Sequence, residues 1–185
     1  MKTLLPETYL IGLVGLLLVI AVLVGRQLIK VRSDEITLIN LDKKNISNSN
    51  DVEKIYELAS VQIRKRLYPQ AISSLKQALL LLEDEPLEAK AVIENAMGFA
   101  LAAQENFKEA IIHYKSAIKA KPEYPVAINN LAFAKQRLYQ FQDALDLYTK
   151  ALKIDPKNQT AQKQLEKIKK RSLVKIEDEK SSKGF

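Results

Sequence analysis

Two stretches of this sequence repeat the same pattern of side chains 34 residues apart. NFKEAIIHYKSAIKAKP occupies residues 106–122, and QFQDALDLYTKALKIDP occupies residues 140–156. The matching pairs are Phe107 and Phe141, Ala110 and Ala144, Tyr114 and Tyr148, Ala117 and Ala151, and Pro122 and Pro156. A period of about 20–50 residues is typical of arrays in which each repeat packs only against its neighbours. The period therefore predicts a stack of similar units without a single central core.

The length of the period and the residue types resemble the tetratricopeptide repeat, in which each unit is a pair of antiparallel helices. A small residue such as Gly98 lets two helix axes approach to about 8 Å, and a large ring such as Tyr114 fills the wider gap beside it. Pro122 lacks the N–H needed to continue a helix and so separates two units. The resemblance predicts an all-α solenoid of three helix-turn-helix repeats, over residues 52–85, 91–124 and 125–158.

The first of these units fits the pattern less well. Gln62 stands where a large apolar residue is usual, and the separating proline comes three residues late, as Pro86. Five extra residues, 86–90, precede the next unit. We therefore expect the second helix of the first unit to be about one turn longer than usual.

The residues after the third unit predict a helix that closes the stack. Ala161, Leu165 and Ile168 form one apolar stripe, with polar residues elsewhere. Such a stripe is typical of the capping helix of a solenoid, which we place at residues 159–172. The remaining residues, 173–185, are mostly charged or small, and we expect them to be disordered.

A long apolar run lies near the N-terminus. No charged residue occurs from Thr8 to Gly25, and residues 10–24 include 12 Leu, Ile or Val. The run is just long enough to cross a bilayer as a helix, and it lacks the polar face of a surface helix. The alternative is a cleaved signal peptide, but Glu7 intrudes on its basic region and Leu23 and Gly25 would occupy the cleavage positions. We predict a membrane anchor in residues 1–25, with a transmembrane span at about 8–25.

The residues that flank the apolar run predict its orientation. Arg26, Lys30 and Arg32 follow it, whereas Lys2 and the terminal amine precede it. The positive-inside rule then leaves the C-terminal bulk on the side where the protein is made. Residues 26–51 are expected to form a polar tether, with residues 36–41 as a short strand, as a surface-associated piece or, more simply, as part of the linker.

Charge and composition argue against several classes of function. The net charge is +7, and much of it lies in residues 159–185, which carry eight basic and four acidic side chains. Nucleic-acid binding requires basic residues gathered on one face with aromatic residues among them, so we expect no nucleic-acid partner. The chain has no cysteine and one histidine, His113, and it shows no phosphate loop or metal-ligand spacing. We expect no catalytic residue, cofactor, metal or small-molecule substrate, and hence no enzyme.

Tetratricopeptide repeats present a concave face, lined by the first helix of each unit, to a segment of a partner protein. In this family the second, fifth, ninth and twelfth positions of a unit generally face that groove. The resemblance therefore implies a partner groove lined by Val92, Asn95, Phe99, Ala102, Val126, Asn129, Phe133 and Gln136. Asn95 and Asn129 are expected to stack as an amide ladder that bonds a partner's backbone, and Phe99 and Phe133 to act as apolar anchors. Alternatively, both phenylalanines pack between adjacent units.

Some repeats of this family clamp the C-terminal carboxylate of chaperones with Lys, Arg and Asn at set positions in three successive units. The corresponding residues here are Tyr56, Ser60, Ala96, Val126 and Asn130. Because none of them is basic, the sequence argues against that role.

The order of the parts resembles one family in particular. An apolar span, a short tether, three repeats and a charged tail are similar to the conserved chloroplast reading frame thirty-seven of cyanobacteria and plastids, with KAVIENAMGFALA opening the second unit and INNLAFAKQRL the third. This resemblance implies a single-pass thylakoid protein whose repeats face the stroma and bind photosystem I subunits or other assembly factors. It implies a scaffold that assists photosystem I assembly or stability. The alternative is a bacterial envelope protein associated with a translocon or with outer-membrane assembly machinery.

Overall fold

The computed structural model describes residues 5–43, 50–82 and 86–182, including the side chains of residues 9–29, 32, 50–82 and 86–170. Throughout these ranges the regular structure is helical. The helices are α1 (Leu5–Lys43), α2 (Val52–Arg64), α3 (Tyr68–Leu81), α4 (Leu87–Ala103), α5 (Phe107–Ala120), α6 (Pro125–Arg137), α7 (Phe141–Ile154) and α8 (Gln159–Ser182). The predicted all-α class is confirmed. The chain divides into two units, Met1–Asn45 and Ile46–Phe185, and each is described by itself.

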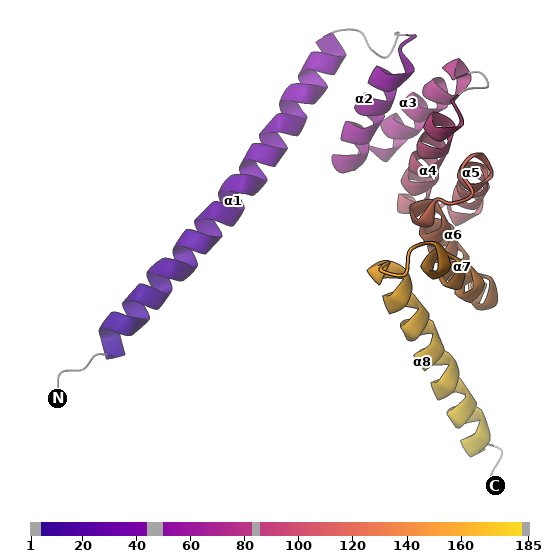
Figure 1. The fold of residues 1–185 in the computed structure, drawn as a ribbon. Helices are drawn as coiled ribbons and strands as arrows, with labels where there is room; N and C mark the ends of the chain where they lie inside the picture. The colour runs from indigo at the N-terminus through magenta and orange to yellow at the C-terminus, as the bar shows by residue number, and fades with distance from the viewer. Residues whose placement is uncertain (1–4, 44–49, 83–85, 183–185) are drawn as a thin grey trace. The chain divides into compact units, whose positions relative to one another are not determined.

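Helices α2 to α7 form three consecutive hairpins: α2 with α3, α4 with α5, and α6 with α7 (Figure 1). The second helix of each hairpin also packs against the helix that follows it, so that α3 contacts α4, α5 contacts α6, and α7 contacts α8. The first helices contact one another as well, α2 with α4 and α4 with α6. This is the predicted solenoid of three repeats, with α8 as the capping helix at its C-terminal end.

The hairpins are held together by small residues packed against one large ring. In the second hairpin Tyr114 of α5 is buried, and Gly98 of α4 lies directly against its ring. A Cβ atom added at Gly98 would come within 2.7 Å of the Tyr114 ring. In the third hairpin Ala132 and Tyr148 occupy the equivalent positions, and both are buried. Burial raises the pKa of both tyrosine hydroxyls, that of Tyr148 to about 12.

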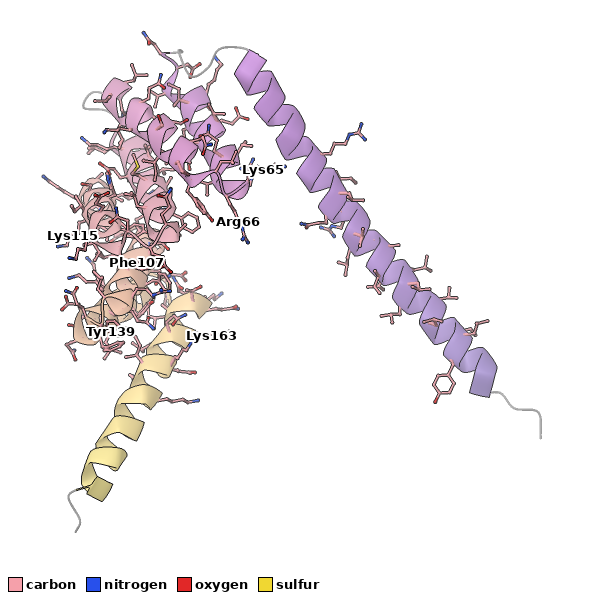
Figure 2. All side chains as sticks on the ribbon, turned by 180° about the vertical axis from the view of Figure 1, so that it is seen from behind. Lys65, Arg66, Phe107, Lys115, Tyr139 and Lys163 are labelled. Carbon is pink, nitrogen blue, oxygen red and sulfur yellow. The ribbon has the colours of Figure 1, made fainter. Side chains whose placement is uncertain are left out.

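The turn inside each hairpin has the same backbone form. Arg66, Glu105 and Tyr139 have φ values of 61°, 62° and 61°, in the left-handed region (Arg66 and Tyr139 are labelled in Figure 2). In the first turn the Leu67 N–H donates to the Gln62 carbonyl at 2.8 Å and the Arg66 N–H to the Ile63 carbonyl at 2.9 Å, and equivalent pairs close the other two turns. This bonding satisfies carbonyls at the end of the first helix, and glycine is its usual left-handed residue. All three turns use a residue with a side chain instead.

The extra residues between the first and second units lengthen α4, and the prediction that they lengthen α3 is wrong. Helix α3 has 14 residues, as α5 and α7 do, whereas α4 has 17 residues against 13 in α2 and α6. The residue before a proline is disfavoured in a helix, so Pro86 marks a boundary, and the helix-forming residues 87–90 after it add a turn to α4. Gln62, in the apolar position of the first unit, accepts a hydrogen bond from Ser74 Oγ at 3.0 Å.

Two other segments are more helical than the sequence predicts. Helix α1 continues to Lys43, so residues 26–43 of the expected tether, including residues 36–41, are helical, whereas residues 44–49 lie outside the described residues. Helix α8 continues to Ser182 through most of the expected disordered tail, and residues 183–185 lie outside the described residues. Residues 26–43 and 173–182 contain no glycine or proline that would end a helix.

Helix α1 contains the apolar run. Residues Tyr9–Ile29 form a 21-residue stretch with a mean hydropathy of 2.4. By length and composition this stretch is able to cross a membrane.

Candidate partner-binding face

The eight residues predicted to line the groove lie on α4 and α6 and differ in their exposure. Phe99 exposes 45% of its surface and Phe133 exposes 40%. Of the other six, Val126 is exposed, Val92, Asn95, Ala102 and Gln136 are half-buried, and Asn129 is buried. The face therefore presents two exposed phenylalanines and an exposed valine, with polar groups that are mostly withdrawn from its surface.

Asn95 and Asn129 do not form the predicted amide ladder. Asn95 Oδ1 accepts a hydrogen bond from Asn130 Nδ2 at 2.9 Å, and Asn95 also bonds the hydroxyl of Tyr124. Asn129 Nδ2 donates to Asn158 Oδ1 at 2.9 Å. Tyr124 directly precedes α6, and Asn158 directly precedes the capping helix α8. Each lies 29 residues after the asparagine that it bonds. The repeated asparagine thus ties the first helix of its unit to the start of the next unit.

Asn129 has a structural role at the C-terminal end of the stack. Its partner Asn158 also accepts a hydrogen bond from the Ala161 N–H at 3.0 Å, which caps the first turn of α8. Asn129 Oδ1 is buried and has no hydrogen-bond partner among the described residues. Through Asn158, Asn129 therefore holds the start of the capping helix in place. Its own side-chain oxygen remains a buried acceptor without a partner among the described residues.

Phe133 belongs to an aromatic region on α5 and α6, and Phe99 occupies the equivalent position on α4. The ring of Phe133 meets the ring of Phe107 edge to face, with centroids 6.3 Å apart, and so packs against the preceding unit while exposing part of its surface. The guanidinium of Arg137 lies over the Phe107 ring, 4.9 Å from its centroid, and its Nη2 is 3.5 Å from Glu105 Oε1 (Phe107 is labelled in Figure 2). A cation above a ring and an exposed ring edge leave this region open to a further apolar or aromatic side chain.

An apolar cleft of about 480 Å³ lies where α2 meets the start of α4. Its walls are formed by Val52, Tyr56, Leu82, Pro86, Ala89, Val92 and Ile93, and Glu53 and Glu88 also line it. Val92 is one of the predicted groove residues, so the cleft adjoins the predicted face. Its volume suits one or two large side chains of a partner.

A polar cluster separates the cleft from the phenylalanines. Val92, Asn95 and Phe99 follow one another at helical spacing on α4, so the cleft, the Asn95 cluster and the aromatic region succeed one another along one face. Burial raises the pKa of the Tyr124 hydroxyl in this cluster, the neighbouring Tyr56 raises it further, and the hydrogen bond with Asn95 opposes both effects. The face has an apolar cleft, a hydrogen-bonding centre and an aromatic end.

Sequence reasoning missed Tyr124 and Arg137. Tyr124 directly precedes the third unit, where no groove position falls. The signal that identifies it is the spacing of 29 residues, which relates Asn95 to Tyr124 as it relates Asn129 to Asn158. Arg137 has no basic counterpart in the second unit, where Ala103 occupies its position, so the repeat pattern did not mark it.

His113 has a role inside the second hairpin. Its Nδ1 is 2.6 Å from Oε2 of Glu94, a buried residue of α4. The pair links α5 to α4 by a polar contact in an otherwise apolar interface. It therefore contributes to the packing of the hairpin.

Comparison with known proteins identifies the family. Residues 125–158 match the tetratricopeptide repeat profile. Ycf37 of Guillardia theta is 30% identical over 137 residues, which cover 74% of this chain and 77% of that protein. Ycf37 of Cyanophora paradoxa is 33% identical over 126 residues, covering 66% of this chain and 72% of that protein. The chain belongs to the Ycf37 family. The family predicted from the sequence is thereby confirmed.

A chloroplast protein and several solved structures are also similar to this Ycf37-family chain. The chloroplastic tetratricopeptide repeat domain-containing protein PYG7 of Arabidopsis thaliana is 28% identical over 164 residues, 89% of this chain and 54% of that protein. MamA (residues 41 to the end) from Desulfovibrio magneticus RS-1 superposes with a TM-score of 0.68 at 18% identity, covering 88% of this chain and 94% of that one.

The first tetratricopeptide repeat domain of Spaghetti (RPAP3), bound to the HSP90 peptide SRMEEVD, superposes with a TM-score of 0.61 at 19% identity and covers 68% of this chain and 96% of that one. These structures support the fold. Together with the family, they indicate a protein-interaction scaffold.

Proposed function

We propose that this Ycf37-family protein is a non-enzymatic scaffold that holds segments of membrane-complex subunits during assembly, and that the complex is photosystem I. The proposal is supported by the tetratricopeptide fold, by the chloroplast relative and by what the family resemblance implies. The observation that carries it furthest is the face along α4 and α6, where Phe99 and Phe133 remain exposed and where an apolar cleft lies further along α4. Exposed rings and an apolar cleft on one face are typical of surfaces that bind a partner.

The chemistry of this face fits the capture of a protein segment. Fully burying a phenylalanine contributes about 1.5–3 kcal/mol, so covering the exposed parts of Phe99 and Phe133 contributes about 1 kcal/mol for each ring. Asn130 and Tyr124 lie between these rings and the cleft and provide groups that bond a backbone. Such a site favours binding of an apolar segment of a client subunit, which leaves the site when the subunit joins its complex.

Helix α1 supplies the anchor in this proposal. A helix of 21 residues is about 31 Å long, which matches the hydrocarbon core of a bilayer at about 30 Å. Arg26 in the last turn of the span, with Lys30 and Arg32 after it, favours an orientation with the repeats on the stromal side of the thylakoid membrane. Holding the face and its clients at one membrane raises their effective concentration, so weak contacts suffice.

Client capture is tested by removing the exposed rings. Phe99→Ala with Phe133→Ala should lower the amount of photosystem I subunits that co-purify from mild-detergent extracts by about tenfold. The matched control is Leu80→Ala with Ile112→Ala, which removes two exposed apolar side chains from the second helices α3 and α5. Equal recovery with both double variants, while circular dichroism shows both folded, would contradict the proposed face.

The anchor and its orientation are tested separately. In sealed thylakoid vesicles with the stromal side outward, added protease should digest the repeats, and the protein should stay with the membranes in alkaline carbonate. Release of the protein by carbonate would contradict a membrane-spanning anchor. Repeats protected until the vesicles are opened would reverse the orientation and favour an envelope-type protein.

A further inference from the structure

We propose that the cleft between α2 and α4 receives a cationic apolar segment of the client, in which Lys or Arg flanks a large apolar side chain. We infer that such a segment is the membrane-proximal end of a client's transmembrane helix. The inference rests on the proposed function, because it names the part of the client that the face receives.

The cleft has an apolar interior that no described residue fills. Leu82 and Ile93 are buried at its base, and Val52, Tyr56 and Val92 are half-buried around it. With a volume of about 480 Å³ the cleft accommodates a leucine or phenylalanine side chain together with the adjacent backbone. Covering the partly exposed walls provides the apolar component of binding.

Charge around the cleft selects the flanking residues of that segment. Glu53 and Glu88 line it and are exposed, and among the described residues no basic side chain lines it. Residues 51–57, 82 and 86–93, which contain all the lining residues, carry four acidic side chains and two lysines in a chain whose net charge is +7. One of the two, Lys54, is paired with Asp51. The surroundings of the cleft are therefore acidic, although the protein as a whole is basic.

Membrane proteins place this kind of segment on the side where they are made. The positive-inside rule enriches Lys and Arg at the ends of transmembrane helices on that side, directly beside apolar residues. In the proposed orientation the repeats are on the same side and close to the bilayer. An acidic, apolar cleft there matches the basic flank of a client helix in both charge and polarity.

The test uses the full chain in nanodiscs of phosphatidylcholine, a neutral lipid that does not itself attract cationic peptides. Three fluorescent 12-residue probes are compared by anisotropy: Leu-Phe flanked by lysines, Leu-Phe flanked by glutamates, and Ser-Ser flanked by lysines. The cleft variant is Glu53→Gln with Glu88→Gln. Its control is Glu109→Gln with Glu166→Gln, which removes the same charge from exposed positions on α5 and α8.

The Leu-Phe peptide with lysines should bind at least about fivefold more tightly than either other probe. The cleft variant should weaken its binding by about fivefold, and the control variant by less than about twofold. Added salt should reduce the difference between the cleft and control variants. Equal binding of the lysine and glutamate probes, or equal effects of the two variants, would overturn the inference. If Phe99→Ala with Phe133→Ala still lowers client recovery by about tenfold in that case, the proposed function stands without this assignment.

Discussion

The second and third hairpins share one sequence pattern and one backbone form, yet they solve the same packing problem differently. Where α4 faces the ring of Tyr114, it carries Gly98, and where α6 faces Tyr148, it carries Ala132. At Gly98 a methyl group would lie 2.7 Å from the Tyr114 ring and 3.1 Å from the Ala110 carbonyl oxygen. The period of 34 residues thus fixes which residues meet, and each pair then determines how closely the helices approach.

The two hairpins also differ in what the tyrosine hydroxyl can bond on the facing helix. Tyr148 Oη donates a hydrogen bond to Gln136 Oε1 at 3.2 Å, on the adjacent helix α6. In the second hairpin Ala102 occupies the position of Gln136 and has no group that bonds Tyr114. A hydrogen bond therefore positions one ring beside an alanine, whereas close contact with a glycine positions the other.

The largest expected effect comes from giving the second hairpin the residue of the third. Gly98→Ala should lower the free energy of unfolding by about 2 kcal/mol, because overpacking against the Tyr114 ring outweighs the better helix propensity of alanine. The measurement is urea unfolding of the protein in detergent, followed by circular dichroism. Ala132→Gly is the reciprocal control and should cost about 1 kcal/mol through helix propensity alone. A neutral Gly98→Ala would show that the Tyr114 ring moves aside freely.

The two repeated asparagines allow a second test. Asn129→Ala should lower the free energy of unfolding by about 1–2 kcal/mol, because it removes the bond to Asn158 and weakens the cap of α8. Asn95→Ala should cost less than about 1 kcal/mol, since Asn95 is half-buried and water reaches its partners Asn130 and Tyr124. Paired urea titrations compare the two variants. A larger loss with Asn95→Ala would contradict the structural role assigned to Asn129.

Burial of the tyrosines predicts a loss of stability in alkali. Tyr148 has a pKa of about 12 when folded and about 10.0 when unfolded, so between these values the unfolded state binds fewer protons. Its contribution is therefore complete below pH 10 and decreases as the pH rises, by about 1 kcal/mol at pH 11. Tyr148→Phe should reduce the slope of unfolding free energy against pH in this window. An unchanged slope would mean that the Tyr148 hydroxyl titrates at its ordinary pKa.

Much of the fold follows from spacing alone, because Ala110, Tyr114 and their counterparts reveal the repeat without further information. The extra turn was assigned to the wrong helix because the sequence shows only where Pro86 stands, and the boundary proline left the helix-forming residues 87–90 to extend α4. The lengths of α1 and α8 were underestimated for a related reason. Polar and charged composition indicates a linker, but it does not end a helix that lacks glycine and proline.

The candidate site was less predictable than the fold. Position in the repeat placed Phe99 and Phe133 on the first helices, but exposure depends on neighbours such as Phe107, which belongs to another helix. Asn95 and Asn129 share one position and differ in burial, because one is next to Tyr124 and the other is next to the capping helix. The cleft is formed by two segments of different units, and no single-unit pattern contains it.

The smallest expected effect concerns a turn that all three hairpins share. Tyr139 holds a left-handed conformation and exposes 81% of its surface, with its ring edge to face with Phe141 at 6.1 Å. Tyr139→Gly should raise the free energy of unfolding by about 0.5–1 kcal/mol, because relief of the left-handed strain exceeds the ring contact and the entropy of glycine. Tyr139→Ala is the control, since it removes the ring and keeps the strain, and it should be slightly destabilising. If glycine destabilises as much as alanine, the contact with Phe141 outweighs the backbone strain at this turn.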